Sequence, residues 1–509
     1  MTLRRLPLVA LAALVVAVVV ADRSHPEAVS PPTYGASPIG QSTPALVDST
    51  GVLSTSWFCP GGPTTDGRTT FLTLFNSNDD AREVALSAVT EGGRTGRRTL
   101  VLPPRNRSVL SLGSLAVGED TAATVTVYGA GVAVEQTVAG RSGVDTTPCA
   151  DATSSTWYLA DGSTTSDAAL RLVLYNPFPN DAVVDVSLTT VERTVEPPDL
   201  QGAVVPGHSV RLFDLAQAAQ REQVVSTAVS SRGAELVASR IESADNPSRR
   251  GFWSKLAAAR PAQTWWFPDG AKGADASEQF VLYNPGDADA SVELSFLPAG
   301  GTGAPPAGAP APGAAPTTAT TPGSAPASTD QTASSSLVEP VSEVVPAGTF
   351  LVVDVNSEKA VANGRHSTVI NVVGDQTPVV AERVLTRQVS GRAATTVLLG
   401  SQLAVTDWYV IDEVASHGGG NLVIMNSAGL ATTAAVKAIG PAGAVDVPGL
   451  SSIAIPAGGA ADVPIPPSAG GFPLLVQVAQ PVVVEWQAPV TLGDNTSHVT
   501  SLAFPVVGN

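Results

Sequence analysis

The sequence has few of the residues that build reactive or metal-binding sites. Its 509 residues include 2 cysteines, 5 histidines and 2 methionines. No CxxC pair occurs, which excludes a thioredoxin-like redox motif and a zinc clip of that type. The histidines are scattered, and HExxH, GxSxG, SxxK and a glycine-rich phosphate loop are all absent. No motif therefore marks a catalytic, metal or cofactor site.

Positive charge is also scarce. The chain contains 28 Lys and Arg against 45 Asp and Glu, and its formal net charge is -17. A surface of this sign repels the phosphate backbone of nucleic acids and the anionic headgroups of lipids. We therefore expect no nucleic-acid partner.

Long apolar runs are missing except at the N-terminus, where residues 6–21 follow Arg4 and Arg5. At about 1.5 Å per residue this run spans about 24 Å, which is shorter than a hydrocarbon core of about 30 Å. Residues 1–21 have the layout of a cleaved signal peptide, and an uncleaved membrane anchor with both arginines inside fits as well. In both cases residues 22–509 are expected outside the cytoplasmic membrane, either secreted or anchored.

The two cysteines, Cys59 and Cys149, form an even pair in a chain that is expected to be exported. Disulfides persist in such compartments, so we predict a bond between them. Two unpaired buried thiols are the alternative. The bond would close a loop of about 91 residues and stabilise the fold by up to about 4 to 5 kcal/mol on the chain-entropy account.

Turn-forming residues, in contrast, are abundant. The chain has 47 Gly and 41 Pro, and 43% of its residues are hydrophobic. This composition favours many short strands separated by turns over long helices. Because single cores rarely grow beyond about 250 to 300 residues, we expect several domains.

One hairpin pattern occurs four times. In residues 170–188 apolar and polar side chains alternate on both sides of the turn NPFPND, which is typical of two half-buried strands. Within the turn, Asn176 can form an Asx turn and Pro177 interrupts strand pairing. The copies are centred on four asparagines: Asn76, Asn176, Asn284 and Asn426.

A tryptophan precedes each of these asparagines by 19 residues in the first three copies and by 18 in the fourth. The four tryptophans are Trp57, Trp157, Trp265 and Trp408. They open the related phrases SWFCPGG, TWYLADG, TWWFPDG and DWYVIDE, and each copy later has a proline-marked strand start and a valine-rich strand. The chain is therefore predicted to contain four internal repeats.

The repeats predict an all-β fold of four tandem immunoglobulin-like β-sandwich modules after the N-terminal signal or anchor segment. A repeat of about 100 residues with about seven short strands suits this fold, whereas the blades of a four-bladed propeller usually have about 40 to 50 residues. The predicted modules span residues 53–150, 151–258, 259–397 and 398–509. Residues 22–52, rich in Pro, Ser and Thr, are predicted to form a stalk.

Module 3 is longer than the others because it contains a low-complexity insert at residues 298–336. The insert lacks the apolar side chains needed to offset its ordering entropy, so we expect a disordered loop inside the module. Its Thr and Ser residues could accept O-linked sugar, and an unmodified spacer is the alternative.

Each repeated tryptophan is followed by a second aromatic residue, and adjacent side chains of a strand point to opposite faces. We expect the first ring in the core and the second outside or at a module interface. Trp266 is such a second residue, and its ring could stack on a sugar. Glu135, Glu382 and Glu485 recur on the terminal strands, with Ser239 in the second copy. We interpret them as edge or outer-face residues that discourage aggregation.

The stretch DGSTTSD offers Asp161, Ser163 and Thr165 as oxygen ligands for a divalent cation. The corresponding stretches GGPTTDG and DGAKGAD do not keep these ligands. We therefore interpret the stretch as a turn rather than a cation site.

The phrases WYLADG, LVLYNP and PVVAER resemble those of exported actinobacterial proteins of unknown function that are built from tandem β-sandwich repeats. The resemblance covers most of residues 53–509 and is weaker in module 4, where DWYVIDE and VIMNSAG depart from these phrases. It implies an envelope location and a non-catalytic architecture, and it supplies no catalytic residues.

The sequence therefore favours a non-enzymatic cell-envelope protein that acts as a scaffold or adhesion module. Its expected partner is another envelope protein or a wall polysaccharide. A carbohydrate-binding protein that uses Trp266 is the first alternative, and a secreted hydrolase with a site built from distant residues is the second.

Overall fold

The described part of the chain consists of β-strands joined by turns and loops. In this computed structural model the described residues are 43–48, 52–140, 143–300, 340–374, 377–389, 391–412, 419–492 and 495–507. They belong to one compact unit, residues 41–509. The sheets are almost entirely antiparallel, and the predicted all-β fold class is confirmed. Among the described residues, no helix has the length and apolar character required to span a membrane.

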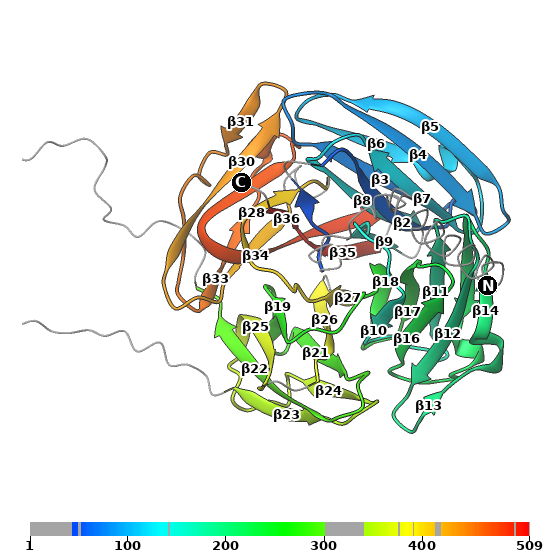
Figure 1. Cartoon of the computed structure of the whole chain (residues 1–509). Coiled ribbons are helices and arrows are strands. Elements are labelled where there is room, and N and C mark those ends of the chain that lie inside the picture. Colours follow the sequence, from blue (N-terminus) through cyan, green and yellow to red (C-terminus); the bar gives the residue numbers. More distant parts are fainter. Residues whose placement is uncertain are drawn as a thin grey trace, which may run out of the picture. The chain divides into compact units, whose positions relative to one another are not determined.

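Module 1 is a sandwich of two four-stranded sheets (Figure 1). Their strand orders are β2-β7-β4-β5 and β6-β3-β8-β9. The strands are β2 Thr55–Gly62, β3 Thr69–Asn76, β4 Arg82–Thr90, β5 Thr95–Leu102, β6 Asn106–Ser111, β7 Thr121–Val127, β8 Val132–Gly140 and β9 Gly143–Pro148, with the short 3-10 helix η1 at Leu112–Ser114.

Module 2 repeats this layout with sheets β10-β16-β12-β13, to which β14 adds, and β15-β11-β17-β18. Its strands are β10 Thr156–Leu159, β11 Ala168–Asn176, β12 Ala182–Thr189, β13 Thr194–Val195, β14 Gln201–Val205, β15 Ser209–Asp214, β16 Ser226–Arg232, β17 Val237–Asp245 and β18 Arg250–Leu256. Two 3-10 turns accompany them, η2 Pro198–Leu200 and η3 Leu215–Gln217.

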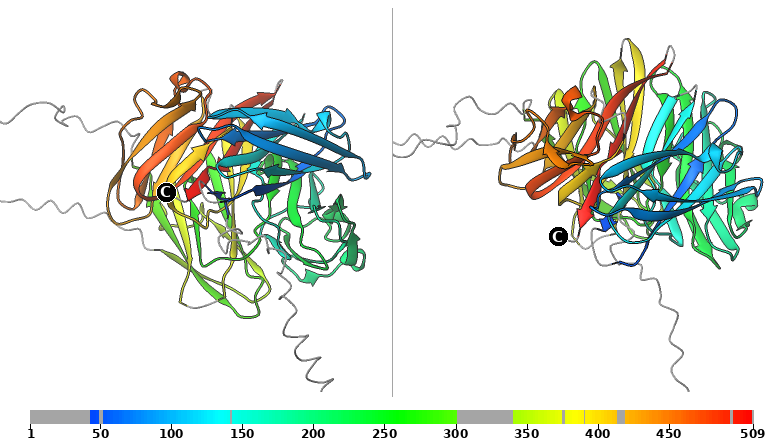
Figure 2. Two further views of the ribbon diagram at one scale, coloured as in Figure 1. Left: turned by 45° about the horizontal axis from the view of Figure 1, so that its top comes forward. Right: turned by 90° about the horizontal axis from the view of Figure 1, so that it is seen from above.

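Module 3 has the sheets β19-β25-β22-β23, with β20 beside β25, and β24-β21-β26-β27. Its strands are β19 Thr264–Phe267, β20 Ala271–Lys272, β21 Ala276–Tyr283, β22 Ala290–Pro298, β23 Val341–Val345, β24 Phe350–Asp354, β25 Gly364–Val372, β26 Val380–Val389 and β27 Arg392–Leu399. The paired sheets can be followed from two further sides in Figure 2.

Module 4 differs because one long strand, β34, contributes to both of its sheets. Its strands are β28 Val405–Val410, β29 Asn421–Asn426, β30 Thr432–Gly440, β31 Gly443–Asp446, β32 Ile453–Ile455, β33 Gly459–Pro464, β34 Leu474–Leu492, β35 Asn495–Leu502 and β36 Phe504–Val507, with the 3-10 turn η4 Pro467–Ala469. β36 lies between β28 and the short strand β1, Val47–Asp48.

The alternation of apolar and polar residues along a strand determines which side chains pack between the two sheets of a module. On β12, Val184, Val186 and Leu188 are fully buried, while the intervening Asp185 and Ser187 are only partly buried. Successive strand residues face opposite sides of a sheet, so the first set packs between the two sheets of its module. The other set faces outward.

The hairpin asparagines hold the turns between β3 and β4, β11 and β12, β21 and β22, and β29 and β30. Asn176 accepts the N–H of Phe178 through Oδ1 at 3.0 Å and donates through Nδ2 to the carbonyls of Asn180 and Val205 at 2.8 and 3.0 Å. Asn76, Asn284 and Asn426 make the equivalent bonds. A fully buried side chain thus satisfies three backbone groups that the turn would otherwise leave unpaired.

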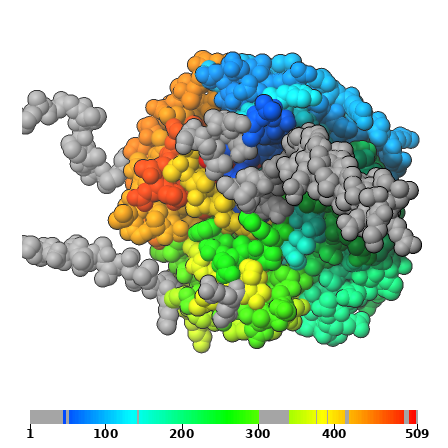
Figure 3. Space-filling model, viewed as in Figure 1, coloured from blue at the N-terminus to red at the C-terminus, as the bar shows by residue number. Residues whose placement is uncertain are grey.

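Contacts between the terminal strands link the four modules in a closed cycle. β9 contacts β18, β18 contacts β27, β27 contacts β35, and β35 contacts β9 (Figure 1). Modules 1 and 4, in blue and orange, accordingly lie side by side in Figure 3. We number the four contact regions by the modules they join: junctions 1–2, 2–3, 3–4 and 4–1.

The stalk predicted for residues 22–52 is wrong for residues 43–48. β1, Val47–Asp48, pairs in parallel with β36, and Ala45 and Val47 are buried in one apolar cluster with Phe504. The apolar segment ALV is thus part of the fold where module 4 meets module 1. The predicted signal or anchor segment and the rest of the stalk up to residue 42 lie outside the described residues.

The insert of module 3 begins slightly later than predicted. Pro298 still belongs to β22, and Ala299 forms a parallel bridge with Ala460 of module 4. These residues are held because β22 runs on to the neighbouring module. The remainder of the predicted insert lies outside the described residues.

Candidate functional site: the junctions between modules

The four repeated tryptophans lie in the cores of their modules. Their side chains are at most 3% exposed: Trp57, Trp157, Trp265 and Trp408. The buried indole N–H finds a backbone acceptor in modules 2 to 4, as where Trp265 Nε1 donates to Val379 at 2.8 Å. These tryptophans therefore pack each sandwich internally.

The aromatic residue after each tryptophan reaches the next module. Tyr409 of module 4 packs edge-on against Phe75 of module 1, with 5.3 Å between ring centroids. Tyr158 of module 2 lies 6.5 Å from Tyr283 of module 3. Phe75 and Tyr283 each precede a hairpin asparagine by one residue. The recurring phrases of the sequence therefore contain both halves of a repeated junction.

Trp266 occupies the same place at junction 3–4. Its ring is partly buried and packs with Val423 and Met425 of module 4. Its backbone exchanges two hydrogen bonds of 2.9 Å with Ser401. A ring held between two modules does not present an open face to a sugar, so its placement does not support the stacking role considered for Trp266.

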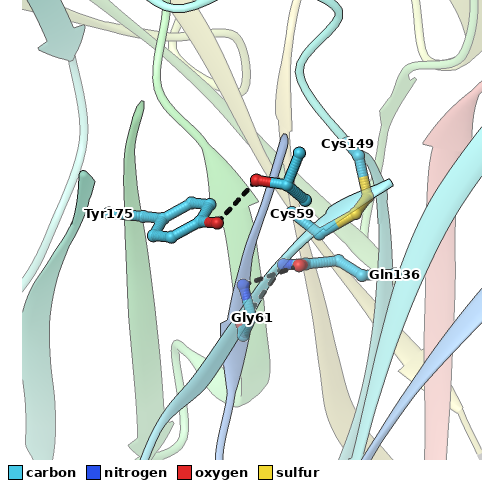
Figure 4. The surroundings of a disulfide bond; sticks show 6 residues. Cys59, Gly61, Gln136, Cys149 and Tyr175 are labelled. Atoms are coloured by element: carbon cyan, nitrogen blue, oxygen red, sulfur yellow. Dashed lines mark hydrogen bonds between the residues drawn. A yellow bond between two sulfur atoms is a disulfide. The ribbon is translucent and has the colours of Figure 1, made fainter. Parts of the chain in front are cut away.

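The cysteines form the predicted disulfide. Cys59 on β2 is bonded to Cys149, which follows β9, and their Cα atoms lie 4.6 Å apart (Figure 4). Both residues are fully buried. The next residue, Ala150, pairs with Phe58, so the bond lies where module 1 passes into module 2.

Next to junction 1–2, module 1 has a neutral donor on its penultimate strand, and the ion pair between Lys255 and Asp145 crosses the same junction elsewhere. Gln136 on β8 accepts the N–H of Gly61 at 2.8 Å and donates to the Gly61 carbonyl at 3.3 Å (Figure 4). The hydroxyl groups of Tyr175 in module 2 and Thr124 in module 1 are 2.6 Å apart, and burial raises the pKa of Tyr175 to about 12. On β17 of module 2, Ser239 stands where the other modules have glutamate.

Junction 2–3 has ions in the equivalent positions. The buried Arg240 on β17 donates to the backbone carbonyl of Asp161 and to Oε2 of Glu382, 2.8 Å away in module 3. Glu382 also accepts the N–H of Asp161 at 3.0 Å. Arg249 binds both carboxylate oxygens of Asp161, at 3.1 and 2.6 Å, and approaches Glu242 to 2.9 Å. Asp161 is thus an ion-pair partner in the junction.

Three carboxyl groups in this cluster share two guanidinium groups. Burial raises the pKa of Glu242 to about 7 and also raises the pKa of Glu382, against the opposing effect of the arginines. For Asp161, Arg249 and Arg240 outweigh the effect of burial and lower its pKa. One of the two glutamates in this cluster is therefore protonated more readily than Asp161.

Junction 3–4 has more positive charge. Arg383 on β26 donates to the backbone carbonyl of Asp269 and to Glu485 Oε1, 2.6 Å away in module 4. The Asp269 carboxylate accepts further hydrogen bonds from Arg387 and Arg365, with shortest distances of 2.8 and 2.7 Å. Although burial raises it, these three arginines bring the pKa of Asp269 well below its ordinary value.

Two further acids border junction 3–4, and each has a basic neighbour. Glu278 Oε2 lies 2.7 Å from Nε2 of His366, and Asp462 of module 4 pairs with Arg365. The junction thus provides a basic group for each of its carboxyl groups, in contrast to junction 2–3.

Junction 4–1 keeps the glutamate but has Trp486 where modules 2 and 3 have arginine. Positive charge is supplied from another strand, because Arg107 on β6 donates to two backbone carbonyls of module 4 at 3.2 and 2.9 Å. Burial and the nearby Asp412 raise the pKa of Glu135 well above its ordinary value, while Arg107 lowers it. A guanidinium group therefore accompanies the buried glutamate at each junction that has one.

Lys255 joins three modules where the terminal strands meet. From β18 of module 2, its Nζ donates to Asp145 Oδ1 and the Thr146 carbonyl of module 1, at 2.8 and 3.1 Å, and to the Thr500 carbonyl of module 4 at 2.9 Å. Burial raises the pKa of Asp145, and the Lys255 ammonium opposes this effect. The ammonium group, in a side chain that is 4% exposed, links the first, second and fourth modules.

The interpretation of the recurring glutamates as outward-facing guards against aggregation is wrong. Glu135, Glu382 and Glu485 are at most 1% exposed and lie in the junctions. The sequence contained a signal for this role, since Arg240 and Arg383 stand directly after the glutamate position of their own modules. Each arginine pairs with the glutamate of the next module rather than with its own neighbour.

Within the described residues, no group of three or more His, Cys, Asp or Glu side chains is placed to hold a metal ion. The buried charged groups of junctions 2–3 and 3–4 are engaged with arginines and backbone groups across the module boundaries. The chemistry of this arrangement is therefore the binding of one module to the next.

The fold and the junctions define a repeat protein in which four β-sandwich modules bind head to tail in a closed cycle. Residues 52–142 and 129–345 match a family of unknown function, DUF5719. Together these regions cover more than half of the chain, and the protein belongs to this family. No match was found among curated proteins.

Proposed function

We propose that the protein is a non-enzymatic component of the cell envelope that acts as a scaffold or adhesion and interaction unit. The observation that carries this proposal is the use of the repeated aromatic and charged side chains in the junctions. The aromatic residue after each repeated tryptophan and the buried Glu382 and Glu485 contact the neighbouring module, and the assembled modules present their outer strands and loops together.

Export is a second element of the proposal. The Cys59–Cys149 bond supports it, because disulfides of this kind are typical of proteins outside the reducing cytoplasm. The apolar N-terminal segment with its two arginines supports it as well. We propose that residues 22–509 work outside the cytoplasmic membrane, either secreted or anchored by the N-terminal segment.

The placement of the acids supports a non-enzymatic role over that of a hydrolase. A hydrolase built from distant carboxyl groups would hold them in an open cleft with access to substrate. Here Asp161, Glu242, Glu382 and Glu485 are at most 1% exposed and are paired with arginines. The perturbed pKa values of Asp161, Glu242 and Glu382 therefore have a structural cause.

Co-sedimentation of the purified chain, residues 22–509, with isolated cell envelope tests the proposal. The expected result is binding to whole envelope that is lost after its proteins are stripped, which identifies a protein partner and a scaffold role. Binding that persists on stripped wall polymer would instead favour recognition of a polysaccharide. Failure to bind either preparation would contradict an envelope role.

A further inference from the structure

A groove of about 300 Å³ lies on the surface at junction 4–1. Module 1 contributes Arg105, Asn106 and Arg107 from the turn before β6 and the start of that strand. Module 4 contributes the β30–β31 hairpin and the loop between η4 and β34: Ile439, Pro441, Gly470, Gly471, Phe472 and Pro473. Its volume is at the lower end of the range of small-molecule sites and suits one or two sugar rings.

Arg107 distinguishes this groove, because the other modules have no arginine at the corresponding strand position. In the strand register, Arg107 of β6 lies opposite Phe75 of β3. The residues that correspond to Arg107 in modules 2 to 4 are Val210, Phe350 and Ala460. Apolar side chains can close a junction, whereas Arg107 extends to two carbonyls of module 4. Junction 4–1 therefore has a charged surface where other modules place an apolar residue.

Phe472 forms an aromatic wall of the groove. Its side chain is 44% exposed, and its ring lies against Gly440 and Gly470, where an added Cβ atom would come within 3.2 Å of the ring. Gly470 and Gly471 have φ values of 69° and 72°, which favour glycine. The glycines thus position a large apolar ring beside charged groups.

Module 1 supplies positively charged side chains to the groove. Arg105 pairs with Asp79, and its side chain remains 29% exposed. A guanidinium group has five N–H donors in a fixed fork, so pairing with one carboxylate leaves it able to bind a second anionic group. Arg107 lies beside Arg105, and its charge also acts on the buried Glu135. In a chain of net charge -17, this combination selects an anionic ligand.

We propose that this groove binds an acidic sugar unit of a polysaccharide. The apolar C–H face of a pyranose ring packs on Phe472, and the sugar carboxylate accepts hydrogen bonds from Arg105. Asn106 provides an amide for the sugar hydroxyl groups. A peptide of Asp and Glu alone would use the arginines but has no ring face to cover Phe472, whereas an acidic sugar supplies the ring and the carboxylate in one unit. The site does not depend on the proposed scaffold role.

Isothermal titration of purified residues 22–509 with defined oligosaccharides tests this site. The probes are a tetrasaccharide of alternating glucuronic acid and N-acetylglucosamine, a tetragalacturonate, and the neutral N-acetylglucosamine tetramer. We expect at least one acidic probe to bind and the neutral one to bind more weakly. Phe472→Ala should lower the affinity by about tenfold, as for loss of one aromatic contact, and Arg105→Gln should remove the preference for the acidic probe.

Two matched variants control for general effects. Tyr128→Ala removes a 54% exposed aromatic ring of module 1 that does not line the groove, and Arg193→Gln removes an exposed arginine of module 2. Neither should change the affinity. Unfolding midpoints of all variants show whether the fold is kept, and an Arg105→Lys variant preserves the charge if Arg105→Gln proves unstable.

The proposal is overturned if neither acidic probe binds, or if binding is the same in Phe472→Ala and Arg105→Gln as in the unmodified chain. Equal binding of polyglutamate would identify a general anion site instead and would also overturn it. The envelope experiment is independent, because a protein partner can be retained when this groove binds no sugar.

Discussion

Junctions 1–2 and 3–4 have the same hydrogen-bond geometry but use different chemistry. In both, a side chain of the penultimate strand donates to the carbonyl of the residue four positions after the repeated tryptophan. Gln136 donates to Gly61 in one, and Arg383 donates to Asp269 in the other. A planar donor therefore occupies this place in both junctions, uncharged in one and charged in the other.

The groups facing these donors change with them. Ser239 of module 2 has the strand position that Glu485 has in module 4, and Glu485 faces the arginine in junction 3–4. A buried charge without a partner costs several kcal/mol, so a neutral set and a charged set are both stable while a mixture of the two is not. The donor and the residue that faces it therefore depend on each other, and we treat each such group of residues as a neutral set or a charged set.

The largest effect is expected from the disulfide at junction 1–2. Cys149→Ser should lower the free energy of unfolding by about 4 to 5 kcal/mol, because the bond closes a long loop in the unfolded chain. Urea unfolding measures this loss, and reduction of the unmodified protein should reproduce it. Equal unfolding midpoints with and without the bond would show that it contributes nothing.

Mixing the two sets is expected to be nearly as damaging. Arg383→Gln alone leaves Glu485 buried without its partner and should cost about 3 to 5 kcal/mol in urea unfolding. The double variant Arg383→Gln with Glu485→Ser transfers the neutral set into junction 3–4 and should recover most of this loss. If the double variant is no more stable than the single one, the residues do not act as a set.

Loss of the neutral donor should have a smaller effect. Gln136→Ala leaves the buried N–H and carbonyl of Gly61 without this partner and should cost about 1 to 3 kcal/mol. Gln220→Ala, at an exposed position of module 2, is the control and should leave the unfolding midpoint unchanged. A midpoint for Gln136→Ala equal to that of this control would contradict the proposed role of the amide.

The smallest effect concerns the unequal charge of the two ion-paired junctions. The pKa of Glu242 rises from an ordinary 4.5 to about 7, so its contribution to stability is complete below pH 4.5 and is lost as the pH rises toward 7. Glu242→Gln should flatten this part of the profile of melting temperature against pH. The effect is small because the proton can be shared among the carboxyl groups.

Junction 3–4 should respond in the opposite sense. The pKa of Asp269 is lowered from an ordinary 3.8, so its contribution is present above pH 3.8 and is lost only as the pH falls below that value. Asp269→Asn should therefore change the melting profile in acid. If Glu242→Gln and Asp269→Asn alter the same pH range, the two junctions do not differ in charge balance.

Much of the fold could be predicted because its signals are local. Alternation within β12 and the Asx turn at Asn176 act over a few residues, and the interval from Trp157 to Asn176 is short. The disulfide followed from composition and compartment, since Cys59 and Cys149 had no other cysteine to pair with.

The junctions could not be predicted in the same way. Arg240 and Glu382 are 142 residues apart, and no periodicity links them. Sequence reasoning places the glutamates on the surface, because a charged side chain is rarely buried without a partner and no local pattern reveals the partner. For Trp266 the sequence left two positions open, outside or at a module interface, and only the structure shows the interface, because the covering residues belong to another module.

The sequence by itself determined the number of repeats, their strand pattern and the hairpin turns, because each depends on neighbouring residues. Only the tertiary structure decided that the modules bind one another in a closed cycle. Closure depends on the rotation between neighbouring modules at every junction, and no local stretch of sequence contains this rotation. Val47 shows this most clearly: its partner Val506 lies at the other end of the chain, and their pairing exists only once module 4 has met module 1.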